Sequence, residues 1–191
     1  MRKIIYSLMV SLDGYVEGPN GELNWSEPGE ELHKHFNDQY LTGEIDTSLY
    51  GRKLYENMAG YWSQDFETDM EPPAHEVEIE FARVWKAIPK IVFSKTLEKV
   101  EWNSTLLREV NPEEITQLKQ QPGSNIDVGG ATLASTFIKH RLIDEYRLYI
   151  HPVTLGEGKP MFPIGVQLNL ELVETQTFAC GVVMLKYQVK E

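Results

Sequence analysis

The sequence predicts an α/β fold in which a mixed, largely parallel sheet is flanked by helices and ends in an antiparallel strand pair. Three observations support this prediction. Strand-like and helix-like segments alternate along most of the chain, as they do where helices connect parallel strands. Two strand-like segments with no helix between them close the chain, which is typical of a hairpin. The segment IDVGGATLAS, residues 126–135, places two adjacent glycines between a strand-like run and a helix-like run, which indicates a junction.

The first elements alternate between the two types. Residues 3–10, KIIYSLMV, are rich in β-forming side chains and predict a strand. A helix is expected at residues 28–41, with Pro28 in its first turn and apolar residues at helical spacing. A short strand at 46–50 and a short helix that opens with glycine at 51–59 follow.

The middle of the chain begins with an acidic, turn-rich loop at residues 61–73. Residues 74–85 carry apolar side chains at helical spacing, which predicts a helix packed on the core. A compact apolar strand is expected at 89–94, and residues 100–110 are expected to be extended. The next segment, 111–123, opens with Asn-Pro, which favours a helix cap followed by proline at the first helical position.

The last part of the chain repeats the alternation and then departs from it. A strand is expected at 125–128, a helix at 131–142 and a strand at 144–153. Residues 167–178 and 182–190 are expected to pair in antiparallel fashion, turning at the Cys-Gly dipeptide between them. There is no repeat, low-complexity tract or linker, so residues 1–191 are expected to form a single domain.

Bulk properties limit the possible partners. The chain has 191 residues, a formal net charge of −11 and a sequence pI near 5.0, which argues against nucleic acid and against anionic membranes as partners. Its apolar runs are shorter than the roughly 20 residues of a membrane helix. The start of the chain alternates and lacks a cleavage site, so a first strand is expected there rather than a signal peptide. The single cysteine, Cys180, fits a cytoplasmic protein.

Ligands of such folds usually lie beyond the carboxyl ends of the strands, and two basic segments are expected there. In YGRKLYE, Gly51 ends a strand while Arg52 and Lys53 open a helix, an arrangement that suits an anion. In VFSKT, Ser94 and Lys95 follow a buried strand and offer a hydroxyl and an ammonium group. A chain reversal with solvated cations is the alternative for the first segment, and an ordinary loop is the alternative for the second.

The glycine pair is the third such segment. Gly129 and Gly130 would let the backbone approach a dinucleotide, and the helix from Ala131 would point its N-terminus at a pyrophosphate. The alternative is a turn that merely needs positive φ. The chain has no G-x-G-x-x-G and no G-K-[ST], so neither standard nucleotide fingerprint is present.

Together these segments resemble a known family. The stretches that carry the resemblance are SLMVSLDGYVEGPNGELNW, LYGRKLYE, PKIVFSKTL, DVGGATLASTFIKHRLIDEYRLYIHPVTLGEGKPMF and the terminal strands. They resemble the dihydrofolate reductase fold, and more closely its branch with the C-terminal reductase domain of bifunctional riboflavin-biosynthesis proteins and their stand-alone bacterial relatives. The resemblance covers nearly the whole chain, and its most specific parts are the glycine pair through LGEGKPMF and the GRKLYE helix start.

The resemblance implies an NADPH-dependent reductase. Its pyrophosphate contacts map onto Gly129, Gly130, Ala131, Thr132 and Leu133. Its contacts to the adenosine 2′-phosphate map onto Arg52, Lys53, Ser94 and Lys95, with Gly51 at the same helix start. Cations at two strand ends of an acidic protein independently fit a 2′-phosphate and favour NADP over NAD.

The first strand and the SLDGYVEG loop resemble the nicotinamide wall and the mobile active-site loop of the family. The resemblance implies that Met9, Val10 and Val16 line the nicotinamide ring and that Asp13 lies near the substrate as a catalytic candidate. Asp-Gly is also a common turn dipeptide, so Asp13 is alternatively a turn residue.

The folate reducers of the family carry an acidic residue early in the second helix, where this chain offers Glu30 or Glu31. Glu31 flanks the apolar stripe of that helix whereas Glu30 points away, so Glu31 is the expected catalytic residue. His35 lies four residues on, within reach of a shared proton path. A solvated helix start, favoured by the helix dipole, is the alternative.

Two departures from the family pattern bear on the substrate. Leu54 replaces the usual threonine of the phosphate site. Pro160 stands where folate reducers carry a threonine, which disfavours pterin recognition. The expected reaction therefore resembles that of 5-amino-6-(5-phosphoribosylamino)uracil reductase, with hydride transfer to a small heterocyclic substrate. The alternatives are dihydrofolate reduction and a non-catalytic nucleotide-binding module of the same fold.

The resemblance also bears on partners and metals. Reductases of this branch commonly pair, so a homodimer is expected. The chain lacks the H-x-E and P-C-x-x-C elements of the zinc deaminase domain that bifunctional members carry. None of its 5 histidines has metal-site spacing with cysteine or acidic partners, so no metal is expected.

Overall fold

The computed structural model describes residues 1–68 and 74–190. Residues 69–73, in the expected acidic loop, lie outside the described residues. The strands are β1 (Ile4–Ser11), β2 (Tyr15–Glu17), β3 (Ile45–Gly51), β4 (Lys90–Phe93), β5 (Ser104–Leu107), β6 (Asn125–Gly129), β7 (Glu145–His151), β8 (Lys159–Pro160), β9 (Leu170–Thr177) and β10 (Val183–Val189). The helices are α1 (Glu30–Leu41), α2 (Arg52–Trp62), α3 (Glu76–Ala87), α4 (Pro112–Gln120) and α5 (Ala131–Lys139).

Eight strands form one mixed sheet in the order β5-β4-β3-β6-β1-β7-β10-β9. The first six of these strands pair in parallel, and β10 pairs in antiparallel fashion with both β7 and β9. The predicted mixed, largely parallel sheet with a terminal antiparallel pair is therefore confirmed. Because β4, β3, β6 and β1 are parallel neighbours, their carboxyl ends meet at one edge of the sheet.

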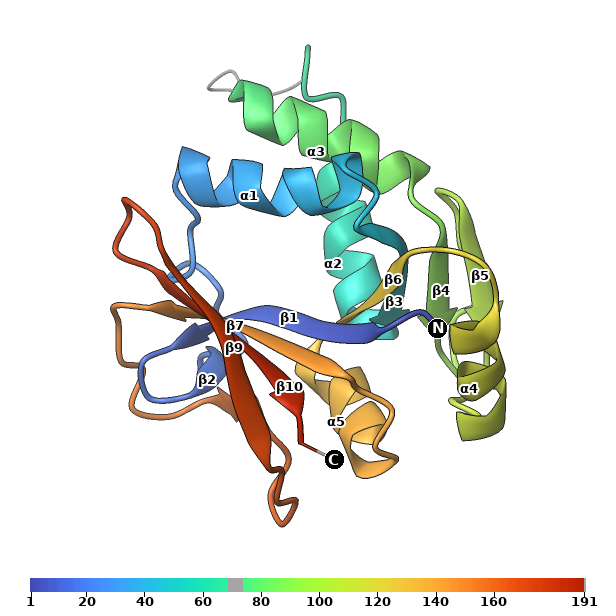
Figure 1. Ribbon diagram of the computed structural model, residues 1–191. Coiled ribbons are helices and arrows are strands. Elements are labelled where there is room, and N and C mark those ends of the chain that lie inside the picture. Colours follow the sequence, from blue (N-terminus) through green and yellow to red (C-terminus); the bar gives the residue numbers. More distant parts are fainter. Residues whose placement is uncertain (69–73, 191) are drawn as a thin grey trace.

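The helices cover both faces of the sheet (Figure 1). Helices α4 and α5 lie on one face, where the largest apolar cluster includes Tyr6, Val128 and Phe137. Helices α1, α2 and α3 lie on the other face, where Tyr50 and Trp85 belong to a separate cluster with α2 and α3. The central strands are consequently buried on both sides, as their continuous apolar runs predict, whereas the edge strand β9 is exposed.

Several element boundaries differ from those expected. Helix α1 begins at Glu30 rather than at Pro28, because Gly29 is extended (φ −63°, ψ 165°) and serves as its N-cap. Helix α5 ends at Lys139, and Arg141 adopts a positive φ of 54°. The small second sheet of β2 and β8 was not expected. Strands of three and two residues are too short to show an alternating pattern.

Within the described residues, no helix combines the length and apolar character that crossing a lipid bilayer requires.

Candidate active site

The predicted cofactor residues gather at the carboxyl edge of three neighbouring strands. In β4 and β3, Phe93 is paired with Gly51, and in β3 and β6, Tyr50 is paired with Gly129. Helix α2 starts directly after β3, and α5 starts one residue after β6. A Cβ atom placed on Gly51 would lie 3.6 Å from Cβ of Leu133, so the starts of the two helices are in contact.

The glycine pair meets two physical requirements at this junction. A Cβ atom on Gly129 would lie 2.6 Å from Cδ2 of Leu54, which is closer than real Cβ contacts, and 3.1 Å from the ring of Tyr50, which is a tight contact. Gly130 has a φ of +87°, which side chains other than that of glycine rarely adopt. The pair therefore makes room for Leu54 of α2 and turns the chain into α5.

The N-terminus of α5 supplies free backbone donors. Its first helical hydrogen bond runs from the N–H of Ala134 to the carbonyl of Gly130, at 3.0 Å. The N–H groups of Ala131, Thr132 and Leu133 thus precede the helical ladder and have no acceptor within it. These three residues are among the five that the resemblance assigns to a pyrophosphate, the other two being Gly129 and Gly130.

Charge is distributed unevenly among the helix starts. Each of α1, α3 and α4 has two acidic residues in its first turn, which is the usual complement to a helix dipole. Helices α2 and α5 begin at the strand-end cluster, which consists of the predicted cofactor residues 51–53, 94–95 and 129–133. Neither helix has an acidic residue in its first turn. The backbone donors and the missing carboxylates together fit a pyrophosphate at this edge.

Two of the cations predicted to contact the 2′-phosphate pair with carboxylates of the protein. Arg52 Nη1 lies 3.0 Å from Oε2 of Glu56. Lys53 Nζ lies 2.8 Å from Oε2 of Glu17, which is also 3.5 Å, through Oε1, from Lys159 Nζ. These four side chains lie at or near the surface: Arg52, Glu56, Lys53 and Glu17.

The loop after β4 is held by its own contacts. Ser94 Oγ accepts hydrogen bonds from the N–H groups of Thr96 (3.2 Å) and Leu97 (3.0 Å). Arg108 Nη1 donates to the carbonyls of Ser94 (3.2 Å) and Leu97 (2.6 Å). Lys95 is exposed beside this loop.

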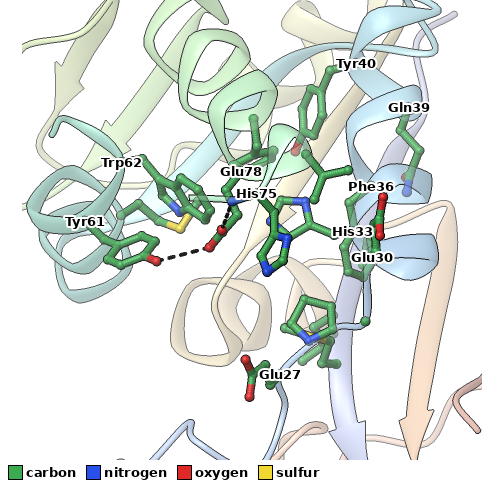
Figure 2. Close-up of a pocket in the computed structure, with 18 of the residues that line it drawn as sticks. Glu27, Glu30, His33, Phe36, Gln39, Tyr40, Tyr61, Trp62, His75 and Glu78 are labelled. Atoms are coloured by element: carbon green, nitrogen blue, oxygen red, sulfur yellow. Dashed lines mark hydrogen bonds between the residues drawn. The ribbon is translucent and has the colours of Figure 1, made fainter. Parts of the chain in front are cut away.

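A cavity of about 700 Å³ is lined by residues of α1, α2, α3 and the sheet. Figure 2 shows Phe36 and Gln39 from α1, Tyr61 and Trp62 from α2, and Glu78 from α3 around it. Strands β1, β3 and β6 supply its floor through Ser7, Met9, Ile45 and Asp127. This size is within the usual range for small-molecule sites.

Most of the cavity wall is apolar, and its polar groups are few. The aromatic lining residues are Phe36, Tyr40, Tyr61, Trp62 and Phe81. The ionisable lining residues, tyrosines aside, are Glu27, Glu30, His33, His75, Glu78 and Asp127. Burial lowers the pKa of His33, which favours its neutral form.

Glu78 is fixed in the wall by two hydrogen bonds, both drawn in Figure 2. The backbone N–H of His75 donates to its Oε2 at 2.8 Å, and the hydroxyl of Tyr61 donates to its Oε1 at 3.4 Å. The first of these bonds is one half of a capping box at the start of α3.

Asp127 is a candidate that the sequence reasoning missed. It lies in the middle of β6, between Ile5 of β1 and Ser48 of β3, and its residue is 7% exposed. Burial raises the pKa of its carboxyl group to about 7, against the opposing effect of the Arg147 charge. The signal was visible in the sequence, because an aspartate interrupts the apolar strand NIDV just before the glycine pair.

Of the three residues predicted to line the nicotinamide ring, Met9 lines the cavity. Val10 and Val16 are buried in the apolar cluster that includes Leu133 and Phe137 of α5. Their side chains therefore pack with the helix on the other face of the sheet.

Asp13 binds backbone groups of the loop after β7. Its carboxylate accepts hydrogen bonds from the hydroxyl of Ser11 (2.7 Å) and the N–H groups of Leu155 (3.1 Å) and Gly156 (2.7 Å). The Ser11 bond, with those from the two amides, lowers the pKa of the Asp13 carboxyl group. These contacts match the turn role, in which Asp13 joins the end of β1 to the LGEGKP loop.

Glu31 lies outside the cavity, and Glu30 is in its lining. The carboxylate of Glu31 accepts a hydrogen bond from the N–H of Ala179 at 2.7 Å, next to the exposed Cys180. Leu32 of α1 packs against β7 and β10, whereas His33 lines the cavity, so the cavity borders the Glu30 side of the helix. His35 Nε2 lies 2.9 Å from the hydroxyl of Tyr149.

Pro160 lies on β8, is exposed, and pairs with Tyr15 of β2. It is absent from the described lining of the cavity, so its position lends no support to the argument against folate. Over residues 1–68 and 74–190, no group of three or more His, Cys, Asp or Glu side chains is arranged to hold a metal ion.

Comparison with known proteins gives a consistent result. The model of the RibD C-terminal domain family matches residues 2–184. The uncharacterized protein YyaP of Bacillus subtilis is 39% identical to the chain over 97% of its length and 94% of the relative's. The uncharacterized protein YwjB of the same organism is 30% identical, over 95% of each chain.

Solved structures share the fold at lower identity. A putative riboflavin biosynthesis protein from Shewanella sp. PV-4 superposes over 100% of both chains, with a TM-score of 0.72 and 22% identity. A Thermotoga maritima diaminohydroxyphosphoribosylaminopyrimidine deaminase/5-amino-6-(5-phosphoribosylamino)uracil reductase matches 99% of this chain and 57% of its own, with a TM-score of 0.64 and 14% identity. The predicted fold class is confirmed by these neighbours.

Proposed function

Since the chain belongs to the RibD C-terminal domain family, we propose that it is an NADPH-dependent reductase that acts on a small heterocyclic substrate. The reaction would resemble that of 5-amino-6-(5-phosphoribosylamino)uracil reductase. One observation carries the proposal, namely that strand β6 and helix α2 contribute both to the substrate-sized cavity and to the strand-end cluster. Asp127 lines the cavity two residues before Gly129, and Met58 lines it from the helix that starts at Arg52.

Bound NADPH supplies the hydride in this proposal, and the protein supplies binding and orientation. The N–H groups of Ala131, Thr132 and Leu133 hold the pyrophosphate. The 2′-phosphate is held by Arg52, Lys53, Ser94 and Lys95. Lys53 exchanges its Glu17 partner for the phosphate, and Glu17 keeps its second cation, Lys159.

The cavity holds the substrate ring in this proposal. Its aromatic walls exclude water, and Met9 packs at the boundary between cofactor and substrate. Asp13 and Glu31 act by positioning the β1–β2 turn and the start of α1, because their carboxylates are bound to backbone N–H groups. Glu30 and Asp127 are the carboxyl groups that face the substrate.

Thermal unfolding with NADPH and with NADH tests the cofactor. A ligand at 100 times its Kd stabilises the native state by about 2.7 kcal/mol, which corresponds to a rise in Tm of roughly 5–10 °C for a chain of this size. The expected result is a clear rise with NADPH and a smaller rise with NADH. Failure of both nucleotides to raise Tm would refute the reductase proposal.

The 2′-phosphate contact has its own test. In the double variant Arg52→Ala/Lys53→Ala, the NADPH shift is expected to fall to the NADH level, while the NADH shift stays the same. Lys99→Ala is the matched control, because Lys99 is also an exposed lysine paired with a glutamate, Glu101. Equal loss of both nucleotide shifts would mean that the two cations act on something other than the 2′-phosphate.

A non-catalytic nucleotide-binding module is the second candidate. The observation that favours it is Leu54, which fills the space beside the glycine pair where the family carries a threonine. NADPH binding without NADPH oxidation across a panel of heterocycles, including dihydrofolate, would support this module. We further propose a cytoplasmic location, because the single cysteine needs no oxidising compartment.

A further inference from the structure

The charge of the cavity restricts its ligand. Four carboxyl-bearing residues line it, namely Glu27, Glu30, Glu78 and Asp127, and no lysine or arginine does so among the described residues. Burial lowers the pKa of His33, so this histidine of the lining does not offset them. A phosphate group placed here would meet carboxylates at close range and no cation.

The predicted cations do not change this balance. Arg52 and Lys53 lie at the exposed start of α2, bound to Glu56 and Glu17, and Lys95 follows β4. None of the three is in the cavity lining. A single molecule thus presents a cation-bearing edge, suited to a nucleotide, and an acidic cavity beside it.

Asp127 is the unusual group of the cavity floor. Its residue is more than nine-tenths buried, it lines the cavity, and no described residue makes a hydrogen bond to its carboxyl group. The titratable and charged groups that act on it are Tyr40 of α1, Tyr50 of β3 and Arg147 of β7. A buried polar group without a partner is costly, so its place in the lining indicates a ligand that completes its hydrogen bonds.

The protonation state of the buried Asp127 carboxyl group determines which hydrogen-bonding edge of a ligand it can bind. Burial keeps a large fraction of Asp127 protonated near neutral pH, because its pKa is raised to about 7. A protonated carboxyl group offers one donor beside one acceptor, and an ionised one offers two acceptors. The first pattern matches a lactam edge, and the second matches the two donors of a protonated amidine or aminopyridine-type edge.

We propose that the cavity binds an aromatic nitrogen heterocycle that is uncharged or cationic and carries no phosphate, and that Asp127 is the specificity-determining residue that hydrogen bonds to its N–H edge. The inference rests on the proposed function, because it names the substrate class of the same site. The proposed ligand differs from the phosphoribosylated substrate in the name of the Thermotoga maritima protein, because it carries no phosphate. Phe36, Trp62 and Phe81 supply flat apolar surfaces for the ring.

Calorimetric titration without cofactor tests the charge preference. The probes are 5-amino-6-(5-phosphoribosylamino)uracil, the same compound without its phosphate, and 2,4-diaminopyrimidine. The expected result is that the phosphate-free riboside or the diaminopyrimidine binds at least tenfold more tightly than the phosphorylated compound. The proposal is overturned if the phosphorylated compound binds as tightly as both, or if neither phosphate-free probe binds.

Variants of Asp127 test its role. Asp127→Leu, which keeps the branched shape of the side chain and removes its polar edge, is expected to weaken binding of the phosphate-free ligand at least tenfold. Asp127→Asn, which keeps a donor and an acceptor, is expected to restore part of that loss. Glu171→Gln on the exposed β9 edge is the matched control and is expected to leave the affinity unchanged. Equal affinity in wild type and Asp127→Leu contradicts the assignment.

Two further readouts keep the test decisive. If Asp127→Leu fails to fold, the pH profile of ligand affinity in wild type and Asp127→Asn replaces it, and a step near pH 7 is expected only in wild type. A profile that is the same in both proteins contradicts the assignment. NADPH-induced thermal shifts are measured separately, so failure of the substrate class leaves the cofactor result in place, and the reverse also holds.

Discussion

At the scale of single residues, Asp127 links the stability of the protein to pH. Its carboxyl group has an ordinary pKa near 3.8, and burial raises this pKa to about 7 in the folded chain. Between these two values the folded state keeps a proton that the unfolded state has lost. Stability from this group is therefore present at low pH and falls as the pH rises from about 4 to about 7.

We expect Asp127→Asn to remove this dependence. The difference in unfolding free energy between variant and wild type should grow in favour of the variant as the pH rises from 4 to 7, by on the order of a few kcal/mol. Urea unfolding at several pH values measures it. A constant difference across this range would show that Asp127 is ionised in the folded state at pH 4.

Asp13 provides a second prediction at this scale. Asp13→Asn keeps the shape and weakens the acceptor, so the bonds to Leu155 and Gly156 should loosen. Because Asp13 is exposed, the global Tm should change little, whereas hydrogen exchange of the Leu155 and Gly156 amides should become faster. Asp38→Asn, an exposed aspartate on α1, is the control and should leave those amides unchanged. Unaltered exchange would show that Asp13 does not hold the loop after β7.

At the scale of elements, the β6–α5 junction is specified by packing against α2. Gly129 is required because the side chains of Leu54 and Tyr50 occupy the space where its Cβ would lie. The same contact fixes the distance between the starts of α2 and α5, because Leu54 belongs to the first turn of α2. The two helix starts are therefore one packing unit, and a change in one is felt by the other.

We expect Gly129→Ala to destabilise the protein by about 1–3 kcal/mol, as overpacking usually does. Leu54→Ala in the same chain should recover part of this loss, because it removes the atom at 2.6 Å. Gly60→Ala in α2 is the control, since nothing lies within 4 Å of its Cβ position. It should stabilise the helix by about 0.5–1 kcal/mol. Additive effects of Gly129→Ala and Leu54→Ala in denaturant unfolding would contradict this contact.

The sequence allowed the order of most elements to be predicted, because long periodic segments such as α3 and β7 carry strong local signals. The junction at the glycine pair was predicted because the pair separates a strand-like run from a helix-like run. The choice between Glu30 and Glu31 was not predictable, since the tertiary structure, and not the helical pattern, decides which side of α1 borders the cavity. The role of Asp127 depends on the cavity that α1, α2 and α3 form together, which no local pattern encodes.

At the scale of the whole molecule, a buried polar network joins α1 to the antiparallel half of the sheet. Arg147 of β7 is 4% exposed, and it donates to Gln39 of α1 (2.8 Å) and Glu145 (2.8 Å), and pairs with Glu44 before β3. Its charge also opposes the effect of burial on Asp127. The network thus holds α1 against the sheet, and its Arg147 also favours the ionised form of Asp127.

Arg147→Met is expected to cost about 3–5 kcal/mol of unfolding free energy, because it removes the nearest cation of the buried Glu145 and leaves only Lys3, at 3.6 Å. It should also raise the pKa of Asp127 further, which a pH titration of stability would detect. Lys186→Met is the control, since Lys186 pairs with the half-exposed Glu174 and surface pairs contribute about 0–1 kcal/mol. Similar losses in both variants would mean that burial of the Arg147 network adds little.

The segment whose Ala179 N–H binds Glu31 also contains a residue that can be labelled, Cys180. Cys180 is the only cysteine of the chain and is exposed, and its Cβ lies 3.3 Å from the Cβ position of Gly29, whose residue borders the cavity. A thiol-reactive fluorophore would therefore attach at one known place, a few ångströms from the cavity rim, in the unmodified sequence. Ligand entry becomes observable in real time, without a colour change in either substrate or cofactor.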